Sequence, residues 1–564
     1  MLKLTLGELI KSSAEQFKDN PALGFVGERL VTYTEIYHKI DSIVAFLEKQ
    51  GIQKGDKIAI LSANQPNWGI TYFALATMGV VVVPILPDFT REEIETVLNH
   101  SESKALFVSE RLLSRIEGLE LPYLKAEILL DDLSLRTGNP DSAGNAGQTE
   151  IIVKENDIAA IIYTSGTTGR SKGVMLTHKN LTFTAMQSYT FQPINHSDVF
   201  LSFLPLSHTY ENTIGMLYPV MYGCSIYYLQ KPPTASALLP ALAKIRPTMM
   251  LSVPLIMEKL FKSQILSKFY SNRFKRMIYK TPVFRKIIHR IAGKKLYETF
   301  GGRLKFFGIG GSKLDSRVER FLKEARFPYA IGYGLTETAP LLAGASPHQT
   351  KVQSTGFAVH GVQLKINNPN KNGVGEIWAK GPNVMVGYYK NPEATAEVLT
   401  EDGWFCTGDF GYFDSHKRLY LKGRMKNTII GSSGENIYPE DIETIINSHK
   451  LVSESLVIEE DGYLVAKVIL EMDIFEKNLE HLKLVIEDKK EKGLKAIREL
   501  DEKKQVWSCN FTKELNTKLN RVSQLKRIDI IDVPFEKTAS QKIKRFLYTT
   551  SKKKSEHNKK KFGE

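Results

Sequence analysis

The chain up to about residue 422 alternates short apolar runs with longer segments of helical periodicity. The runs at 58–61, 105–108, 249–252 and 304–308 have the length of buried strands. Strands that alternate with helices in this way are typical of layered α/β sheets. The pattern therefore predicts an α/β architecture for most of the chain.

The most apolar stretch, residues 70–86, has the composition of a core helix and strand rather than of a membrane span. It contains two threonines, a glycine and a proline, and it is slightly short for a bilayer crossing. We therefore predict a helix followed by a buried strand at 80–83. Residues 1–11 place charges inside any apolar core of a signal peptide, so they predict an ordinary amphipathic helix.

One loop is unusually rich in hydroxyl groups and glycines. Residues 157–163 have the pattern of a buried strand, residues 173–177 that of a second strand, and His178 begins a helix. The intervening segment, 163–174, reads YTSGTTGRSKGV. Glycines let backbone N–H groups point at an anion, while the hydroxyls and the Lys172 ammonium add donors and charge. The segment predicts a site for the phosphates of a nucleoside triphosphate.

The spacing distinguishes this loop from a Walker loop. A Walker loop needs Gly, four residues and then Gly-Lys-Ser/Thr leading directly into a helix, and Gly166, Gly169 and Lys172 do not fit that spacing. A polar surface turn is the alternative. The length of the run, between two apolar strands, favours the phosphate loop.

Length and composition are those of a large globular protein. A chain of 564 residues exceeds what one hydrophobic core usually serves, so we expect two or more domains. Hydrophobic residues at 42% and charged residues at 24% argue against extensive disorder. Three widely separated cysteines give neither a disulfide framework nor a metal-binding spacing, and a cytoplasmic location is expected.

The net charge of +14 is concentrated in two segments. Residues 259–303 carry thirteen Lys or Arg and one Glu, and the tail 542–564 carries nine Lys or Arg and two Glu. Peripheral contact of 259–303 with the inner face of a membrane, a solvated helix pair whose aromatics pack inward, and an acidic protein partner all stay open. Nucleic-acid binding is not expected, because no recognised module accompanies the charge. The interleaved aromatics are Phe261, Phe269, Tyr270, Phe274, Tyr279 and Phe284.

The loop at 163–174 resembles the phosphate loop of the AMP-forming adenylating enzymes, which include acyl-CoA synthetases, peptide-synthetase adenylation domains and firefly luciferases. Four further segments resemble that family's motifs in the expected order: 333–338 (YGLTET, adenine and magnesium), 407–409 (TGD, ribose), 423–426 (GRMK, hinge) and 537–545 (KTASQKIKR, C-terminal lysine). The resemblance covers the chain from about residue 5 to about residue 548, and chance does not supply five ordered motifs.

The resemblance implies a fold and its division. The expected fold is α/β, with a large N-terminal adenylate-forming domain of layered α/β sheets plus a β-barrel-like subdomain, and a small mobile α+β C-terminal domain. The expected boundaries are 1–422 for the first domain, 423–426 for the hinge and 427–548 for the second domain. A charged helical excursion at 473–504 and a basic tail at 549–564 complete the division.

The resemblance also implies a nucleotide site with Mg²⁺. Glu337 is the implied metal ligand, Thr336 the contact to the α-phosphate, Asp409 the acceptor from both ribose hydroxyls, and Tyr333 the residue lying against the adenine. Taken alone, Asp409 has the setting of a turn residue, and Glu337 that of an acid in the first turn of a helix. The remaining implied ATP-binding residues are Thr164, Ser165, Gly166, Thr167, Thr168, Gly169, Lys172, Gly310, Gly311, Ser312, Gly334 and Arg424.

Lys542 is the implied catalytic lysine of the C-terminal domain, which reaches the carboxylate and the α-phosphate. The family most often has glycine at the position of Gln541, a difference that bears on the geometry of this loop. Family members rotate the C-terminal domain between half-reactions, and Lys426 is the implied pivot. Residues lining the implied thiol tunnel are Gly434, Glu435 and Asn436.

The acyl substrate is predicted from residues 203–208, FLPLSH. Amino-acid-activating relatives place an aspartate in this stretch, and its absence here indicates a substrate without a positive charge. The Leu-Pro-Leu-Ser-His form resembles the fatty-acid-activating members. His208 either orients the carboxylate or packs at a helix N-terminus. Candidate wall positions of an acyl tunnel are Gly215, Met216, Tyr218, Pro219 and 308–311.

The resulting hypothesis is a long-chain fatty acid:CoA ligase that uses ATP, Mg²⁺ and CoA to form acyl-AMP and then acyl-CoA. An acyl–acyl carrier protein synthetase is the nearest alternative, since it needs the same nucleotide site but a protein-bound thiol. A nucleotide-binding relative without turnover is a third possibility. The presence of Lys542, Glu337 and Asp409 argues against it.

Overall fold

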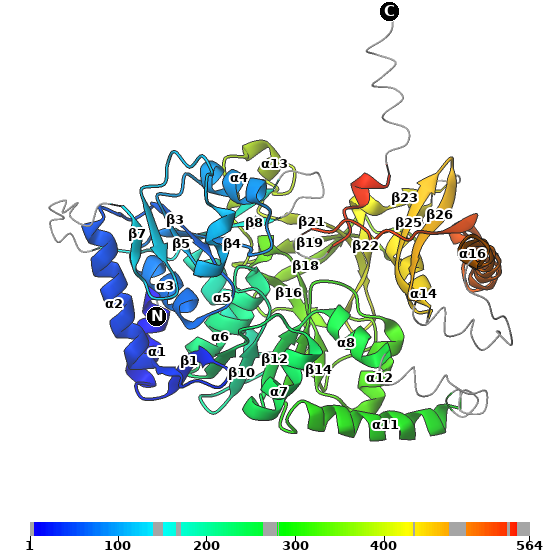
Figure 1. The fold of residues 1–564 in the computed structure, drawn as a ribbon, viewed down its shortest axis with the longest axis horizontal. Helices are drawn as coiled ribbons and strands as arrows, with labels where there is room; N and C mark the ends of the chain where they lie inside the picture. Colours follow the sequence, from blue (N-terminus) through cyan, green and yellow to red (C-terminus); the bar gives the residue numbers. More distant parts are fainter. Residues whose placement is uncertain are drawn as a thin grey trace, which may run out of the picture.

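The computed structural model describes residues 5–138, 151–164, 171–262, 279, 281–431, 435–449, 451–472, 492–538 and 542–549. Figure 1 shows a large body built from the N-terminal three quarters of the chain, with β25, β26 and α16 grouped at one side. Two large sheets and several smaller ones form the molecule, which confirms the predicted α/β class.

The first large sheet has eight strands in the order β20-β9-β8-β4-β3-β5-β6-β7. Its centre is parallel, and β9 and β20 add antiparallel neighbours beside β8. The predicted strands at 58–61, 80–83, 105–108, 157–163 and 173–177 all belong to this sheet. The strands are β3 (Lys57–Leu61), β4 (Val81–Ile85), β5 (Ala105–Val108), β6 (Ala126–Leu129), β7 (Leu135–Thr137), β8 (Ile158–Thr164), β9 (Lys172–Thr177) and β20 (Gly387–Tyr388).

The second large sheet has seven strands in the order β14-β13-β12-β10-β11-β1-β2. All pairs except β1 with β2 are parallel. The predicted strand at 249–252 is β12, and that at 304–308 begins later, as β13. The strands are β1 (Pro21–Phe25), β2 (Val31–Thr32), β10 (Val199–Ser202), β11 (Ser225–Tyr228), β12 (Met249–Ser252), β13 (Phe306–Ile309) and β14 (Tyr329–Ile331).

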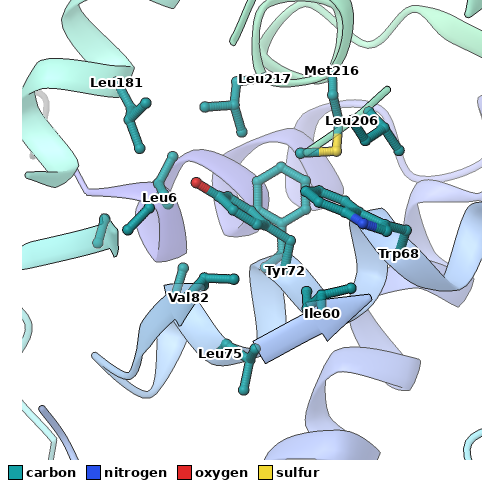
Figure 2. Close-up of a cluster of buried hydrophobic side chains, with 14 of the residues drawn as sticks. Leu6, Ile60, Trp68, Tyr72, Leu75, Val82, Leu181, Leu206, Met216 and Leu217 are labelled. Atoms are coloured by element: carbon teal, nitrogen blue, oxygen red, sulfur yellow. The ribbon is translucent and has the colours of Figure 1, made fainter. Parts of the chain in front are cut away.

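Helix α3 (Pro66–Thr77) joins the two sheets, contacting β4 of the first and β1 of the second. Its residues from Trp68 to Ala76 are all buried, because it is enclosed on every side. Figure 2 shows Trp68 and Tyr72 among side chains from the first sheet, such as Ile60 and Val82, and from the helices around them. The same cluster includes side chains of the second sheet. This explains the most apolar stretch of the sequence as core. Among the described residues, no helix is long and apolar enough to cross a membrane.

Further helices cover the sheets, and the two nearest the N-terminus begin at threonine caps. The helix predicted at the N-terminus is α1. The helices are α1 (Leu6–Gln16), α2 (Tyr33–Lys49), α4 (Arg91–Ser101), α5 (His178–Ser188), α6 (Tyr218–Met221), α7 (Ala235–Ile245), α8 (Pro254–Phe261), α11 (Pro282–Thr299), α12 (Ser316–Ala325) and α13 (Pro392–Ala396), with the π-helix η2 (Glu211–Leu217) and the short 3₁₀ turn η1 (Glu110–Arg115).

The subdomain expected to resemble a barrel consists of two open antiparallel sheets. No strand pairing among the described residues closes them into a barrel. One sheet has three strands, β15 (Tyr333–Gly334), β16 (Leu341–Gly344) and β17 (Phe357–Ala358). The other has four, β18 (Gln363–Asn367), β19 (Gly375–Lys380), β21 (Phe405–Phe413) and β22 (Leu419–Arg424).

The C-terminal part forms a small α+β unit with its own buried cluster. Of the predicted excursion at 473–504, residues 473–491 lie outside the described residues, and the helix α16 continues beyond residue 504. Phe511 and Leu515 of α16 are buried in the cluster. The boundaries proposed for the domains stay a prediction. The elements are β23 (Ile429–Ile430), β24 (Asn436–Ile437), α14 (Pro439–Asn447), β25 (Val452–Glu460), β26 (Tyr463–Leu470), α16 (Lys492–Asn516) and β27 (Arg527–Ile530).

Gly334→Ala tests the tight turn between β15 and β16. A Cβ at this position would lie 1.6 Å from the carbonyl oxygen of Pro340, so the backbone must move. We expect the free energy of unfolding to fall by about 3 kcal/mol or more. Gly462→Ala is the control, because Gly462 has φ +80° but open space around it, and about 1–2 kcal/mol is expected there. Equal losses in thermal or denaturant unfolding would contradict the packing argument.

Candidate active site

Three residues from three different motifs form one hydrogen-bonded group. Asp409 on β21 pairs in register with Arg424 on β22, and the Asp409 Oδ1 atom lies 3.0 Å from Arg424 Nε. The other carboxylate oxygen accepts a hydrogen bond of 2.8 Å from the Tyr333 hydroxyl. Each carboxylate oxygen has two lone pairs, so Asp409 keeps acceptor capacity for a pair of ribose hydroxyls.

Tyr333 is buried, whereas a side chain that stacks on a nucleotide base needs one ring face open to the ligand. Tyr333 is 6% exposed and packs in the cluster between the two small sheets. Burial and the neighbouring Asp409 charge raise the pKa of Tyr333, so its hydroxyl stays protonated and donates to Asp409. The structure therefore gives Tyr333 a positioning contact to Asp409, while its predicted contact with adenine stays a prediction.

Glu337 and Lys172 are connected through a tyrosine that the sequence did not single out. Glu337 lies in the 3₁₀ turn η4 (Thr336–Thr338), and its Oε1 accepts a hydrogen bond of 2.9 Å from the Tyr388 hydroxyl. The Lys172 ammonium lies over the Tyr388 ring, 4.6 Å from its centroid. Tyr388 reaches this place because β20 pairs with β9, a contact no motif spacing reveals.

Glu337 fits the role of a magnesium ligand. Its second oxygen is not used by Tyr388, and carboxylate oxygen is the donor that Mg²⁺ prefers. Among the described residues no group of three His, Cys, Asp or Glu side chains converges on a metal position. Thr336 lies beside Glu337 in the same turn and is half-buried.

The phosphate loop leaves one strand and returns on its antiparallel neighbour. Its central residues, 165–170, lie outside the described residues, and they include Ser165, Gly166, Thr167, Thr168 and Gly169. Thr164, the last residue of β8, pairs with Lys172, the first residue of β9. The Thr164 hydroxyl donates to the Lys172 carbonyl oxygen at 3.5 Å. The predicted connection between two strands is confirmed, and it differs from the strand-to-helix Walker loop.

Lys542 belongs to the C-terminal part of the chain, but the charged groups that act on it belong to this site. Burial and the charge of Arg424 lower the pKa of Lys542, and the carboxylates of Asp409 and Glu337 oppose that shift. The residue itself keeps contact with solvent. The Thr538 N–H donates to the Lys542 carbonyl oxygen at 2.8 Å. Gln541 lies outside the described residues.

His208 interacts with the charge of the same lysine, although the two residues lie far apart in the sequence. Burial and the Lys542 charge lower the pKa of His208 to about 4, so its ring is neutral at pH 7. His208 Nδ1 accepts the backbone N–H of Tyr210 at 3.2 Å, which leaves the ring proton on Nε2. The residue also stands at the helix N-terminus, where the Asn212 N–H donates to its carbonyl oxygen. Both interpretations of His208 therefore have a structural basis.

A small apolar cavity lies near His208 and is lined by Tyr210, two residues further along the chain. Its volume is about 50 Å³. Tyr210, whose N–H contacts His208, lines it together with Ile214 and Phe306. Of the predicted wall positions, Tyr218 and Gly308 line it as well.

The other predicted wall positions do not line this cavity. Met216 is fully buried in the main hydrophobic core, as Figure 2 shows, and Gly215 and Pro219 belong to the same buried turns. Gly310 approaches the Tyr210 ring, where an added Cβ would lie 3.2 Å from the nearest ring atom. Gly311 has φ +91°, which favours glycine, and Ser312 follows it on the exposed side of the loop.

Glu211, three residues after His208, is an acid that the sequence reasoning passed over. It is 2% exposed, it is hydrogen-bonded to Ser202, and its Oε2 has no described partner. Burial raises the pKa of Glu211 to about 8. A neutral carboxyl does not pair with a substrate ammonium, so the prediction of a substrate without positive charge is unchanged.

The segment after the sheet of β21 and β22 contacts that sheet through half-buried ion pairs and through the rings of Phe410 and Tyr438. Lys426 is exposed in the 3₁₀ turn η5 (Met425–Asn427). Asp441 of α14 receives Lys313 at 2.7 Å and Lys422 at 3.4 Å. In the predicted thiol tunnel, Gly434 lies outside the described residues, the Glu435 carbonyl accepts from the Gly431 N–H at 2.8 Å, and Asn436 pairs with Ile430. The roles of these residues stay predictions.

A search of protein families finds a match that covers most of this site. Residues 10–389 match the family of AMP-binding enzymes. The chain belongs to the AMP-binding enzyme family. The match ends at Tyr389, directly after the Tyr388 that contacts Glu337 and Lys172.

Curated relatives of this AMP-binding enzyme cover most of the chain. The peroxisomal long chain acyl-CoA synthetase 6 of Arabidopsis thaliana is 30% identical, over 83% of this chain and 74% of that protein. The long-chain-fatty-acid–CoA ligase heimdall of Drosophila melanogaster is 28% identical, over 80% of this chain and 74% of that protein. The chloroplastic long-chain-fatty-acid–acyl-carrier-protein ligase AEE15 of Arabidopsis thaliana is 28% identical, over 89% of this chain and 80% of that protein.

Solved structures share the fold. The o-succinylbenzoate CoA synthetase MenE of Bacillus subtilis, in complex with ATP and magnesium ion, has a TM-score of 0.74 and 24% identity, and the match covers 95% of this chain and 98% of that chain. MatB of Rhodopseudomonas palustris, bound to ATP, has a TM-score of 0.74 and 21% identity, and the match covers 96% of this chain and 98% of that chain. These similarities establish an adenylating-enzyme fold, and this protein is an AMP-forming ligase by family.

Glu211→Gln tests the neutral buried acid. A folded-state pKa of about 8, raised from the ordinary value of 4.5, means that the folded state binds more protons between those pH values. The contribution of Glu211 to the free energy of unfolding is therefore largest below pH 4.5. It falls as pH rises to 8, by up to about 4 kcal/mol. Gln removes that slope, while the exposed Glu393→Gln does not. The free energy of unfolding is measured with denaturant from pH 5 to 8 in the unmodified protein and in both variants. The same dependence on pH in all three proteins would refute the raised pKa of Glu211.

Proposed function

We propose that this AMP-forming ligase activates a long-chain fatty acid to its acyl-adenylate and transfers the acyl group to the thiol of CoA. The observation that carries the proposal is the apolar lining of the cavity near His208, a residue that interacts with the charge of Lys542. This lining suits an acyl chain, for which the cavity must widen, and we propose that the substrate carboxylate lies toward Lys542 and the group of Asp409, Arg424 and Tyr333.

The chain's own residues suit the first half-reaction. A carboxylate oxygen forms a bond to the α-phosphorus while the bond to the β-phosphate oxygen breaks, and pyrophosphate leaves. Both reactants are anions, so the Lys542 ammonium and the His208 Nε2–H stabilise charge that develops between them. Lys172 lies on the phosphate side. Mg²⁺ held at Glu337 supplies further neutralisation of the phosphates when bound.

The second half-reaction needs a thiol in place of pyrophosphate. The sulfur bonds to the acyl carbon and AMP leaves. The charge interactions of Lys542 with Arg424, Asp409 and Glu337 support a role for it in adenylation, so we propose that the part after residue 426 rotates before the thiol reacts. Among the described residues, the contacts that this rotation must break include two half-buried ion pairs to Asp441, a hydrogen bond of 3.0 Å from Lys262 Nζ to the Val452 carbonyl oxygen, and the packing of Tyr438 on Phe410. Ion pairs near solvent contribute about 0–1 kcal/mol each.

The acceptor thiol has a second candidate. Two of the relatives above are named as CoA ligase or acyl-CoA synthetase and one as an acyl-carrier-protein ligase. The basic segment at 259–303 suits an acidic carrier protein as well as other anionic surfaces. A cytoplasmic location belongs to the same proposal, since all three cysteines are free.

Transfer of labelled palmitate decides between the acceptors. With ATP and Mg²⁺ present, CoA and holo acyl carrier protein are offered in parallel, and thioester and pyrophosphate are measured. We expect palmitoyl-CoA. Thioester on the carrier protein alone would replace the CoA proposal with the alternative. ATP binding without pyrophosphate release from any fatty acid would refute both.

Lys542→Ala and Lys426→Pro separate the two half-reactions. Removal of the Lys542 ammonium should slow acyl-AMP formation about 100-fold or more, while thioester formation from preformed acyl-AMP is largely kept. Proline at Lys426 should do the reverse by restricting the hinge backbone. Lys544→Ala controls for the loss of a nearby charge, and Lys426→Ala for the loss of the side chain. Single-turnover assays that show equal loss of both steps in Lys542→Ala would contradict the assignment.

A further inference from the structure

Helix α11 presents an apolar ridge to solvent. It lies lengthwise along the outside of the large body, at the bottom of Figure 1, next to α12. Val283, Phe284, Ile287 and Ile291 are 66%, 54%, 50% and 69% exposed. Positions 283, 287 and 291 follow one another at four-residue spacing, so they lie along one face of the helix.

The opposite face of α11 is fixed to the body and cannot turn to bury the ridge. Gly293 is buried so closely against Ala325 of α12 that an added Cβ would lie 2.4 Å from the Ala325 Cβ. Arg285 Nη2 lies 2.8 Å from Glu324 Oε1, and His289 Nδ1 lies 2.7 Å from Glu324 Oε2. The orientation of the helix is therefore set by specific contacts, and the exposure of the ridge follows from them.

Cations flank the ridge on both sides. On a helical projection, Lys286 and Arg290 lie on one side of the line through 283, 287 and 291, Lys295 on the other, and Lys294 near the line itself. All four are exposed, and none forms an ion pair with any other residue that the structure describes. Glu298, near the C-terminal end, is the one acid of the helix.

This arrangement refines what the sequence left open for residues 259–303. Phe261 and Tyr279 are buried, as the solvated-helix interpretation requires, but Phe284 is exposed, as membrane contact requires. Residues 263–278 lie outside the described residues, so Phe269, Tyr270 and Phe274 carry no part of the argument. The relevant surface is the outer face of α11.

We propose that the outer face of α11, residues 283–295, docks on the surface of an anionic lipid bilayer. Apolar side chains along the crest enter the acyl boundary, while the lysines and Arg290 at its flanks contact the headgroup phosphates. A convex ridge with cations on both sides fits a planar anionic interface. An acidic protein would use the cations but would need a groove of its own for the ridge.

The docking adds a lipid partner to the protein and does not depend on the identity of its acyl acceptor. A fatty acid is a component of such a surface, so docking brings the protein to the phase where the proposed substrate partitions.

Vesicle flotation of the full chain tests the docking. Vesicles of phosphatidylcholine alone are compared with vesicles that also contain phosphatidylglycerol. We expect binding to the anionic vesicles, weakened by added salt. The double substitution Phe284→Asp and Ile287→Asp should lower the apparent affinity at least about tenfold, and Lys286→Glu with Lys294→Glu should remove the dependence on phosphatidylglycerol.

The matched control places the same charges on exposed valines elsewhere, Val506→Asp with Val533→Asp, which are 62% and 74% exposed. The control should bind like the unmodified protein. All variants should keep their unfolding temperature and their activity on a water-soluble short-chain acid, since no α11 residue belongs to the site. Flotation that is absent in the unmodified protein, or that is equal in the ridge variant and the control, overturns the proposal. Loss of acyl transfer to carrier protein with vesicle binding intact assigns the ridge to a protein partner and overturns it equally.

Discussion

The carboxylate of Asp409 is the interaction on which the rest of the site depends. It is 8% exposed and connects β21 to Arg424 of β22 and to Tyr333 of β15. A buried carboxylate requires such partners, because an unpaired charge in a low-dielectric setting is costly. The same group contributes to the electrostatic environment of Lys542, so the nucleotide side of the site and the C-terminal lysine share one set of charges.

Charge is distributed unevenly across the site. Lys172, Arg424 and Lys542 converge from three segments on a region whose described carboxylates are Asp409 and Glu337. On the other side of His208 the surroundings are neutral, since burial keeps Glu211 protonated below about pH 8. A polyanion and an apolar chain can therefore be bound within one site without competing for the same surface, which is the requirement of the proposed adenylation.

The C-terminal part has an apolar core of its own, and its described contacts with the large body are mainly polar. Its cluster buries side chains from β25, β26 and α16, whereas half-buried lysines pair with Asp441, Lys262 donates to the Val452 carbonyl oxygen, and Tyr438 packs against Phe410. Rigid units connected by weak polar contacts are free to change their relative position at modest cost in free energy. The outer face of α11 shows the converse, because close packing through Gly293 holds an apolar surface in solvent.

The sequence by itself determined the α/β class, seven of the fifteen strands of the large sheets, and the family, because strand patterns and motif residues are local. It also predicted that Asp409, Arg424 and Tyr333 belong to one site. Only the tertiary structure decided that Tyr333 is buried beneath Asp409, that Tyr388 joins Lys172 to Glu337, and that Glu211 is neutral. These depend on pairing between distant strands and on burial from several elements, which no local pattern records. For the same reason the sequence predicted only a basic segment at α11, and its packing against Ala325 determined which face meets solvent.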